Sequence, residues 1–129
     1  MELKCMLVTV TDMERARKFY EDIFGLELLQ DNDGNMLLSG GVALQRKDIW
    51  EKFLGRDVLP KSNASELYFE DPDVEGLVAR LEQLYPETEF VNRLMTHTWG
   101  QTVTRFYDPD GNLIEVGTPM AGNCRSRME

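Results

Sequence analysis

Two glutamates are candidates for chemistry because each lies in an otherwise apolar strand. Glu115 falls between Ile114 and Val116, so strand alternation places its carboxylate on the face opposite those two side chains. Glu66 begins another predicted strand and shares a face with Tyr68. A carboxylate on an inner strand face can bind a cation or transfer a proton. We therefore take Glu115 and Glu66 as candidate catalytic residues and Tyr68 as a candidate ligand contact.

An internal repeat adds a thiol to this pair. At one constant offset Cys5 aligns with Glu66 and Asp12 aligns with Asp73, and the apolar positions of the following helices also align. Cys5 is therefore expected on the same strand face as Glu66, although a small buried apolar role also suits a lone cysteine. Two carboxylates and a thiolate form a candidate divalent metal site, in which the thiolate favours Zn²⁺ or another softer ion.

Two other uses of the glutamates remain open. Carboxylates that lie close together repel each other, which raises one pKa and suits acid–base chemistry without a metal. Alternatively, both glutamates face water in an open binding cleft and only set its charge. The sequence therefore leaves a metal site, metal-free chemistry and a simple binding cleft as three hypotheses.

Further ligand contacts are expected along the last hairpin. If its turn is Asp108–Gly111, Thr104 pairs with Glu115 and Phe106 pairs with Leu113. Thr104 and Phe106 then share the face of Glu115, and we take both as candidate ligand contacts.

The segment Met95–Gln101 is predicted to be a loop between two strands, and it contains the single histidine. Loops at the rim of a cleft often carry function, and an imidazole suits proton transfer near neutral pH. His97 is therefore a candidate catalytic residue, or else an ordinary surface histidine. Trp99 either contacts a flat ligand or anchors the hairpin.

The elements that must position these residues occur twice, in the order strand, helix, strand, strand, strand. The first copy is predicted to contain a strand at 3–10, a helix from Thr11 or Asp12 to Gly25, and strands at 26–30, 36–38 and 42–46. A short helix at 48–54 and a polar linker at 55–63 follow. The second copy is predicted to contain a strand at 66–70, a helix from Asp71-Pro72 to Pro86, and strands at 89–91, 102–107 and 113–116.

This repeat predicts an α+β fold in a single domain. Module 1 covers about residues 1–57, module 2 covers about 64–119, and 120–129 form a frayed tail that includes Cys124. One module alone exposes a large sheet face. We therefore expect two βαβββ modules to form a curved mixed sheet around a cleft, with the helices outside.

Two segments resemble a known superfamily. Val8–Leu26 is similar to the opening of the glyoxalase/bleomycin-resistance/extradiol-dioxygenase proteins, the vicinal oxygen chelate superfamily. Trp99–Gln101 and Arg105–Val116, which contains Asp-Pro-Asp-Gly-Asn, are similar to its close. The resemblance covers about residues 3–118, and it implies the same fold as the repeat.

The resemblance also implies where a metal would bind. The superfamily positions fall on Cys5, Glu66 and Glu115, and a fourth falls on Ala43, which cannot bind a metal. The implied ion is Zn, Ni, Mn or Fe. Because the chain has one histidine, it lacks the two imidazoles that the dioxygenase members use.

The implied activity is that of a glyoxalase-like lyase or isomerase, in which a metal assists chemistry on a small oxygenated substrate. The alternative is a metal-free binding protein that resembles the bleomycin-resistance members and sequesters a cationic or aromatic ligand. Many single-domain relatives pair, so the resemblance also implies a homodimer.

Composition limits the partners. The net charge is −9 over 129 residues, which disfavours nucleic acid and anionic membranes as partners. No apolar stretch approaches the length that spans a bilayer, and the N-terminus lacks the features of a signal peptide. We therefore expect a cytoplasmic protein whose partner is a small molecule.

Overall fold

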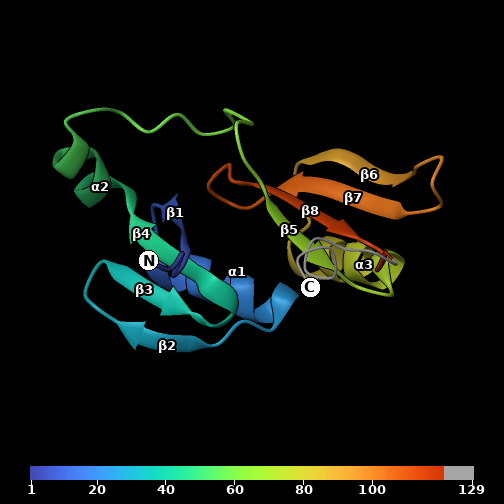
Figure 1. Cartoon of the computed structure of the whole chain (residues 1–129), viewed down its shortest axis with the longest axis horizontal. Coiled ribbons are helices and arrows are strands. Elements are labelled where there is room, and N and C mark those ends of the chain that lie inside the picture. Colours follow the sequence, from blue (N-terminus) through green and yellow to red (C-terminus); the bar gives the residue numbers. More distant parts are fainter. Residues whose placement is uncertain (121–129) are drawn as a thin grey trace. The chain divides into compact units, whose positions relative to one another are not determined.

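The computed structural model describes residues 1–120, and the predicted tail with Cys124 lies outside them, apart from Met120. The chain divides into two compact units (Figure 1). Unit 1 contains Met1–Ser62 and Pro109–Asn112, and unit 2 contains Asn63–Asp108 and the chain from Leu113 onwards. Within residues 1–120, no helix is both long and apolar enough to cross a membrane.

Unit 1 contains the first βαβββ module. Its elements are β1 (Met6–Val10), α1 (Met13–Phe24), β2 (Leu28–Asp31), β3 (Asn35–Leu38), a short 3₁₀ turn (Ser39–Gly41), β4 (Val42–Arg46) and α2 (Lys47–Leu54). The four strands form a mixed sheet in the order β1-β4-β3-β2, in which only β1 and β4 are parallel.

Helix α1 begins and ends at the residues that its sequence indicates. Asp12 is the N-cap, and its carboxylate accepts a hydrogen bond from the backbone N–H of Arg15. Gly25 ends the helix in the left-handed conformation, with φ of 67°. One face of the helix is buried, through Ala16, Phe19, Tyr20 and Ile23.

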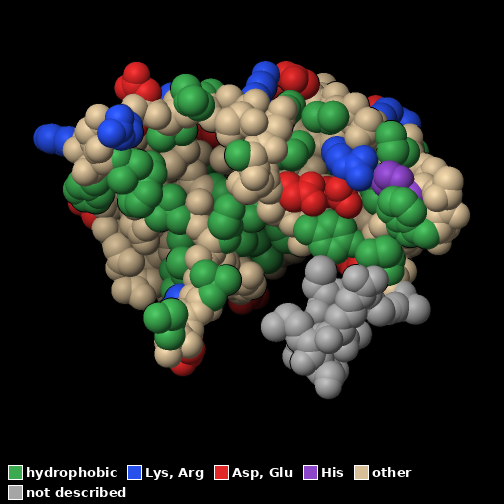
Figure 2. Space-filling view, turned by 45° about the horizontal axis from the view of Figure 1, so that its top comes forward, with side chains coloured by type: hydrophobic (Ala, Val, Ile, Leu, Met, Phe, Trp, Pro, Cys, Tyr) green, Lys and Arg blue, Asp and Glu red, His purple; other side chains and the backbone are tan. Residues whose placement is uncertain are grey.

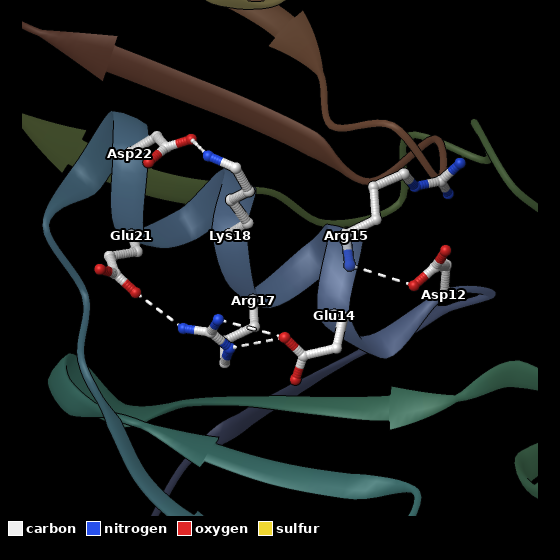
Figure 3. Close-up of polar contacts among 7 residues, drawn as sticks. All are labelled: Asp12, Glu14, Arg15, Arg17, Lys18, Glu21 and Asp22. Atoms are coloured by element: carbon white, nitrogen blue, oxygen red, sulfur yellow. Dashed lines mark hydrogen bonds and ion pairs between the residues drawn. The ribbon is translucent and has the colours of Figure 1, made fainter.

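The opposite face of α1 carries charged side chains joined by ion pairs (Figure 3). Arg17 bridges Glu14 at 3.1 Å and Glu21 at 2.8 Å, and Lys18 contacts Asp22 at 2.9 Å. Exposed pairs of this kind at helical spacing add little to stability, because water screens the charges. The charged run is therefore a solvated helix face.

Unit 2 contains the second βαβββ module. Its elements are β5 (Leu67–Glu70), α3 (Val74–Leu84), β6 (Phe90–Thr96), β7 (Thr102–Tyr107) and β8 (Leu113–Gly117). The strand order is β5-β8-β7-β6, which repeats the arrangement of unit 1. The prediction of an α+β fold with two βαβββ modules and mixed sheets is therefore confirmed.

The start of α3 differs from the prediction. Asp73, not Asp71, is the N-cap, and its carboxylate accepts from the N–H of Gly76 at 2.9 Å. Asp71 instead accepts from the N–H of Asp73 at 2.7 Å. Aspartates often form such local turns, so Asp71-Pro72 leads into the helix and does not begin it.

The register of the last hairpin is also corrected. Arg105, not Thr104, pairs with Glu115, and Phe106 pairs with Ile114. The turn includes Asn112 in addition to the predicted residues, because its side-chain amide donates to the carbonyl of Thr9 at 3.0 Å. One added turn residue shifts the pairing by one and exchanges the two faces of β7.

The same turn is anchored in unit 1 by Asp110. Its Oδ1 accepts from the backbone N–H of Thr11 at 3.0 Å, from the Thr11 hydroxyl at 2.8 Å and from Nη2 of Arg15 at 3.0 Å. Lys61 N–H also donates to the carbonyl of Gly111 at 3.0 Å. The turn therefore fixes the chain that enters α1.

Candidate functional site

A row of polar side chains crosses all four strands of unit 2 on one face of the sheet. Tyr68 of β5 pairs with Glu115 of β8, Glu115 pairs with Arg105 of β7, and Arg105 pairs with Asn92 of β6. The neighbouring positions point the other way: Ile114, Val116 and Phe106 are at most 1% exposed, and α3 packs against β7. Unit 2 thus has an apolar core face and a polar face.

Arg105 is the centre of this polar face. Its Nε donates to Oε1 of Glu115 at 2.7 Å, and its Nη1 donates to Oδ1 of Asn92 at 2.9 Å. Its Nη2 lies 3.1 Å from Nε2 of His97. The side chains of Arg105 and Glu115 are only 23% and 12% exposed, so water screens their attraction weakly. In Figure 2 acidic, basic and histidine side chains lie next to one another on this surface.

His97 contacts both Arg105 and Trp99. A guanidinium has only hydrogen-bond donors, so in this contact Nε2 of His97 is the acceptor. The imidazole also stacks on the indole of Trp99, with ring centroids 4.1 Å apart and planes inclined by 8°. His97 therefore links the aromatic part of the face to its ion pair.

Glu66 lies beside this ion pair, at the exposed position directly before β5. Partial burial of its carboxyl is the main reason why the pKa of Glu66 is raised. The negative charge of Glu115 and a hydrogen bond to it raise the pKa further, while the positive charge of Arg105 lowers it. Glu66 and Glu115 thus form a carboxyl pair in which Arg105 neutralises one member.

Tyr68 continues the face beyond Glu115. Its hydroxyl donates to Oε2 of Glu70 at 2.8 Å and accepts from Nε2 of Gln101, also at 2.8 Å. Burial and the hydrogen bond to Glu70 raise the pKa of Tyr68 to about 12, so its phenol stays neutral. Its side chain remains available to a ligand because the residue is 40% exposed.

Two predicted ligand contacts lie elsewhere. Thr104 and Phe106 are both fully buried, on the core face opposite Glu115. Their assignment to the polar face was wrong, because it rested on the register that the longer turn shifts. The structure does bring Glu66, Tyr68, Glu115, His97 and Trp99 to the polar side of unit 2 through the contacts described above.

The donor set does not fit a divalent metal. Among residues 1–120, no three His, Cys, Asp or Glu side chains are grouped so that they could hold an ion. Glu115 and His97 both direct their acceptor atoms at the guanidinium of Arg105, which already supplies a positive charge there. Cys5 belongs to unit 1, where it is a half-buried free thiol.

Sequence reasoning missed Arg105 and Gln101. Arg105 could have been found as the basic residue opposite Glu115 on the neighbouring strand. That pairing can be recognised only when the register of the hairpin is correct. Gln101 was predicted to be in a loop, yet its residue is only 6% exposed. A polar side chain next to the start of an apolar strand was its only signal.

The chain is similar to proteins of one family. The model of the glyoxalase-like domain matches residues 3–121, and no curated protein sequence matches. A solved protein of unknown function from Agrobacterium tumefaciens str. C58 is 32% identical, with a TM-score of 0.74 over 93% of this chain and 95% of that one.

Two other solved structures share the fold at lower identity. A glyoxalase/bleomycin resistance protein/dioxygenase family enzyme from Burkholderia phytofirmans PsJN is 14% identical, with a TM-score of 0.77 over 93% of this chain and 100% of that one. Lactoylglutathione lyase from Agrobacterium tumefaciens is 22% identical, with a TM-score of 0.64 over 88% and 90%. Because the family model matches residues 3–121, the chain belongs to the glyoxalase-like domain family.

Proposed function

We propose that this protein binds a small, flat, cationic ligand on the polar face of unit 2, without a metal. The observation that carries the proposal is the 2.7 Å bond from Arg105 to Glu115, the carboxylate at the superfamily's metal position. A divalent ion at Glu115 would have to displace the guanidinium or lie against it. Binding without a metal is the mode expected of a protein that resembles the bleomycin-resistance members.

The side chains of the face favour a ligand that is both flat and positively charged. Trp99 is 63% exposed and Tyr68 is 40% exposed, and aromatic faces of this kind attract cations. Glu66, Glu70 and Glu115 carry more negative charge than Arg105 can neutralise. A planar cation therefore has a stacking surface and an acidic rim on the same face.

The proposal is tested by titration calorimetry in the presence of a chelator. Proflavine, a flat aromatic cation, is compared with acridine at a pH where it is neutral, and with an aromatic carboxylate of similar size. We expect proflavine to bind at least tenfold more tightly than the carboxylate, and Trp99→Ala to weaken its binding while Trp50→Phe does not. Equal affinity for cation and anion, or binding that Trp99→Ala leaves intact, would refute the proposal.

A second function is the lyase or isomerase activity implied by the resemblance, and one observation favours a metal-free form of it. The raised pKa of Glu66 gives a carboxyl group that can hold a proton at higher pH than an ordinary glutamate and pass it to a bound substrate. Arg105 could stabilise an anion that develops next to it.

Elemental analysis of the purified protein distinguishes metal-free binding and metal-free catalysis from a metal-assisted lyase or isomerase. The proposal expects no stoichiometric Zn, Ni, Mn or Fe in the wild type. Near-stoichiometric metal that disappears in Glu115→Ala would instead favour the metal-assisted lyase or isomerase. The homodimer and the cytoplasmic location stay predictions.

A further inference from the structure

Two exposed aromatic side chains of the polar face are held by one buried side chain. Trp99 and Tyr68 both bond to Gln101, whose residue is only 6% exposed. Exposed aromatic side chains are ordinarily free to change rotamer, and that freedom is lost when a ligand stacks on them. A buried group that fixes both in advance removes part of this loss.

The hydrogen bonds of Gln101 have a defined direction. Its Nε2 donates to the carbonyl oxygen of Thr118 at 3.1 Å, and a carbonyl can only accept, so the amide nitrogen must lie on that side. Oε1 therefore faces the indole, where it accepts from Nε1 of Trp99 at 3.1 Å. The remaining hydrogen of Nε2 goes to the hydroxyl of Tyr68 at 2.8 Å.

The chain of bonds continues from Tyr68 to Glu70. Because the Tyr68 oxygen accepts from Gln101, its own hydrogen is free to be donated to Glu70. A directional chain thus runs from Trp99 through Gln101 and Tyr68 to Glu70. The Trp99 residue is 63% exposed although its indole stacks on His97.

Gly117 of β8 makes room for this arrangement. A Cβ atom at Gly117 would collide with Nε2 of Gln101 and would lie 3.3 Å from the hydroxyl of Tyr68. The backbone of Gly117 has no positive φ that would itself require glycine. Position 117 is therefore glycine because any side chain there would occupy the space of Gln101.

We propose that Gln101 is the positioning residue of the ligand face: it does not touch the ligand, but it holds Trp99 and Tyr68 as a preformed aromatic pair, with Gly117 providing its space. This inference rests on the proposed function, in which a flat ligand stacks on that pair. It predicts that removing the amide weakens binding without removing any ligand contact.

The test uses Gln101→Met in a Trp50→Phe background, where Trp99 is the only tryptophan. Methionine keeps the volume and removes all three hydrogen bonds. We expect faster fluorescence anisotropy decay of Trp99 in the free protein and about tenfold weaker proflavine binding, the size expected from two side chains that must be ordered on binding.

Gln45→Met is the matched control. Gln45 is as buried as Gln101, at 5% exposure, and its Oε1 accepts from the side chain of Asn35 at 2.9 Å, within unit 1. It should lower thermal stability to a similar extent but leave the anisotropy of Trp99 and the Kd for proflavine unchanged. Equal effects of the two variants on Kd would reduce Gln101 to a structural role and overturn the inference.

A second variant covers the case in which Gln101→Met does not fold. Tyr68→Phe removes one of the bonds of Gln101 and keeps an aromatic ring, so we expect about threefold weaker binding and an intermediate anisotropy decay. If Gln101→Met does not fold, an unchanged decay in Tyr68→Phe alone would overturn the inference. If proflavine fails to bind the parent protein, the proposed function fails, and the anisotropy measurement still decides whether Gln101 holds Trp99.

Discussion

The two units share one strand order but carry different side chains at equivalent strand positions. In unit 2 a row crosses the sheet through Tyr68, Glu115, Arg105 and Asn92. In unit 1 the equivalent row, with the same pairing, contains Leu7, Ala43, Leu37 and Gln30. One row contains charged side chains and the other does not, so the repeat keeps the fold while the chemistry of this row differs between the two copies.

The comparison also extends to the neighbouring position on the last strand of each module. Gln45 of β4 is equivalent to Gly117 of β8, because Gln45 pairs with Thr9 and Gly117 pairs with Glu70, at matching places of β1 and β5. In unit 1 a side-chain amide of the strand fills the space. In unit 2 the strand has no side chain, and Gln101 enters from outside the strand. The same space is therefore filled in two ways.

The largest expected effect separates the two faces of unit 2. Phe106→Ala should lower the free energy of unfolding by about 3–5 kcal/mol, because Phe106 is fully buried on the core face. Tyr68→Phe, on the polar face, should cost about 1 kcal/mol. Urea denaturation measures both. If Phe106→Ala lowered the free energy of unfolding by less than about 1 kcal/mol, Phe106 would not be a core residue, and its assignment as a ligand contact would stand.

The next prediction concerns replacing the charged residues of the unit 2 row by the apolar residues found at equivalent positions in unit 1. Arg105→Leu leaves Glu115 poorly solvated without its cation and should cost about 2–3 kcal/mol, less than a fully buried pair because both side chains are partly exposed. Arg105→Leu with Glu115→Ala reproduces Leu37 and Ala43 of unit 1, and we expect it to lie within about 1 kcal/mol of the wild type.

The control for this cycle is Arg93→Leu, which breaks the ion pair with Glu82. These side chains are 55% and 46% exposed, so the variant should be nearly as stable as the wild type in the same urea experiment. A double variant that is as unstable as Arg105→Leu would mean that the polar row is required for folding, and the two rows would not be interchangeable.

The smallest effect is a dependence on pH that unit 2 should have through Glu66. Because the folded-state pKa of Glu66 is raised, the folded protein binds more protons than the unfolded chain between the two pKa values. Its contribution to stability is therefore present below the unfolded pKa and is lost as the pH rises through the folded pKa.

Glu66→Gln should remove this pH-dependent loss of stability. We expect the loss to be on the order of a few tenths of a kcal/mol, because the side chain is largely solvated. Thermal unfolding at several pH values measures it, with the exposed Glu87→Gln as the control. Binding of a cation should strengthen over the same pH interval, because ionised Glu66 attracts it. A stability profile that Glu66→Gln leaves unchanged would contradict the raised pKa.

The sequence predicted most of the fold because local signals were clear. Asp12 and Gly25 mark the ends of α1, and the aligned apolar positions after Asp12 and Asp73 predicted two equivalent helices. The end of β6 was harder to predict, because its residues are largely exposed and lack an alternating pattern. Edge strands bury little, so their sequences carry a weak periodic signal.

The site was predicted only in part. The strand patterns were enough to place Glu66 and Tyr68 on one face of their strand and Glu115 on the face opposite Ile114 and Val116, because alternation depends only on neighbours in sequence. Thr104 and Phe106 were assigned to the wrong face, because the pairing of β7 with β8 depends on the length of their turn. Asn112 extends that turn through a hydrogen bond to Thr9, a residue far away in the sequence.

The sequence by itself determined the family, the repeated order of elements and the candidate acidic residues, since all of these follow from residue types and short-range spacing. The tertiary structure decided that a guanidinium, Arg105, lies against Glu115 and His97, and that Gln101 joins Trp99 to Tyr68. Those contacts depend on strand register and on side chains from separate strands and loops. Local propensity does not encode them, because a shift of one residue exchanges the faces of a strand.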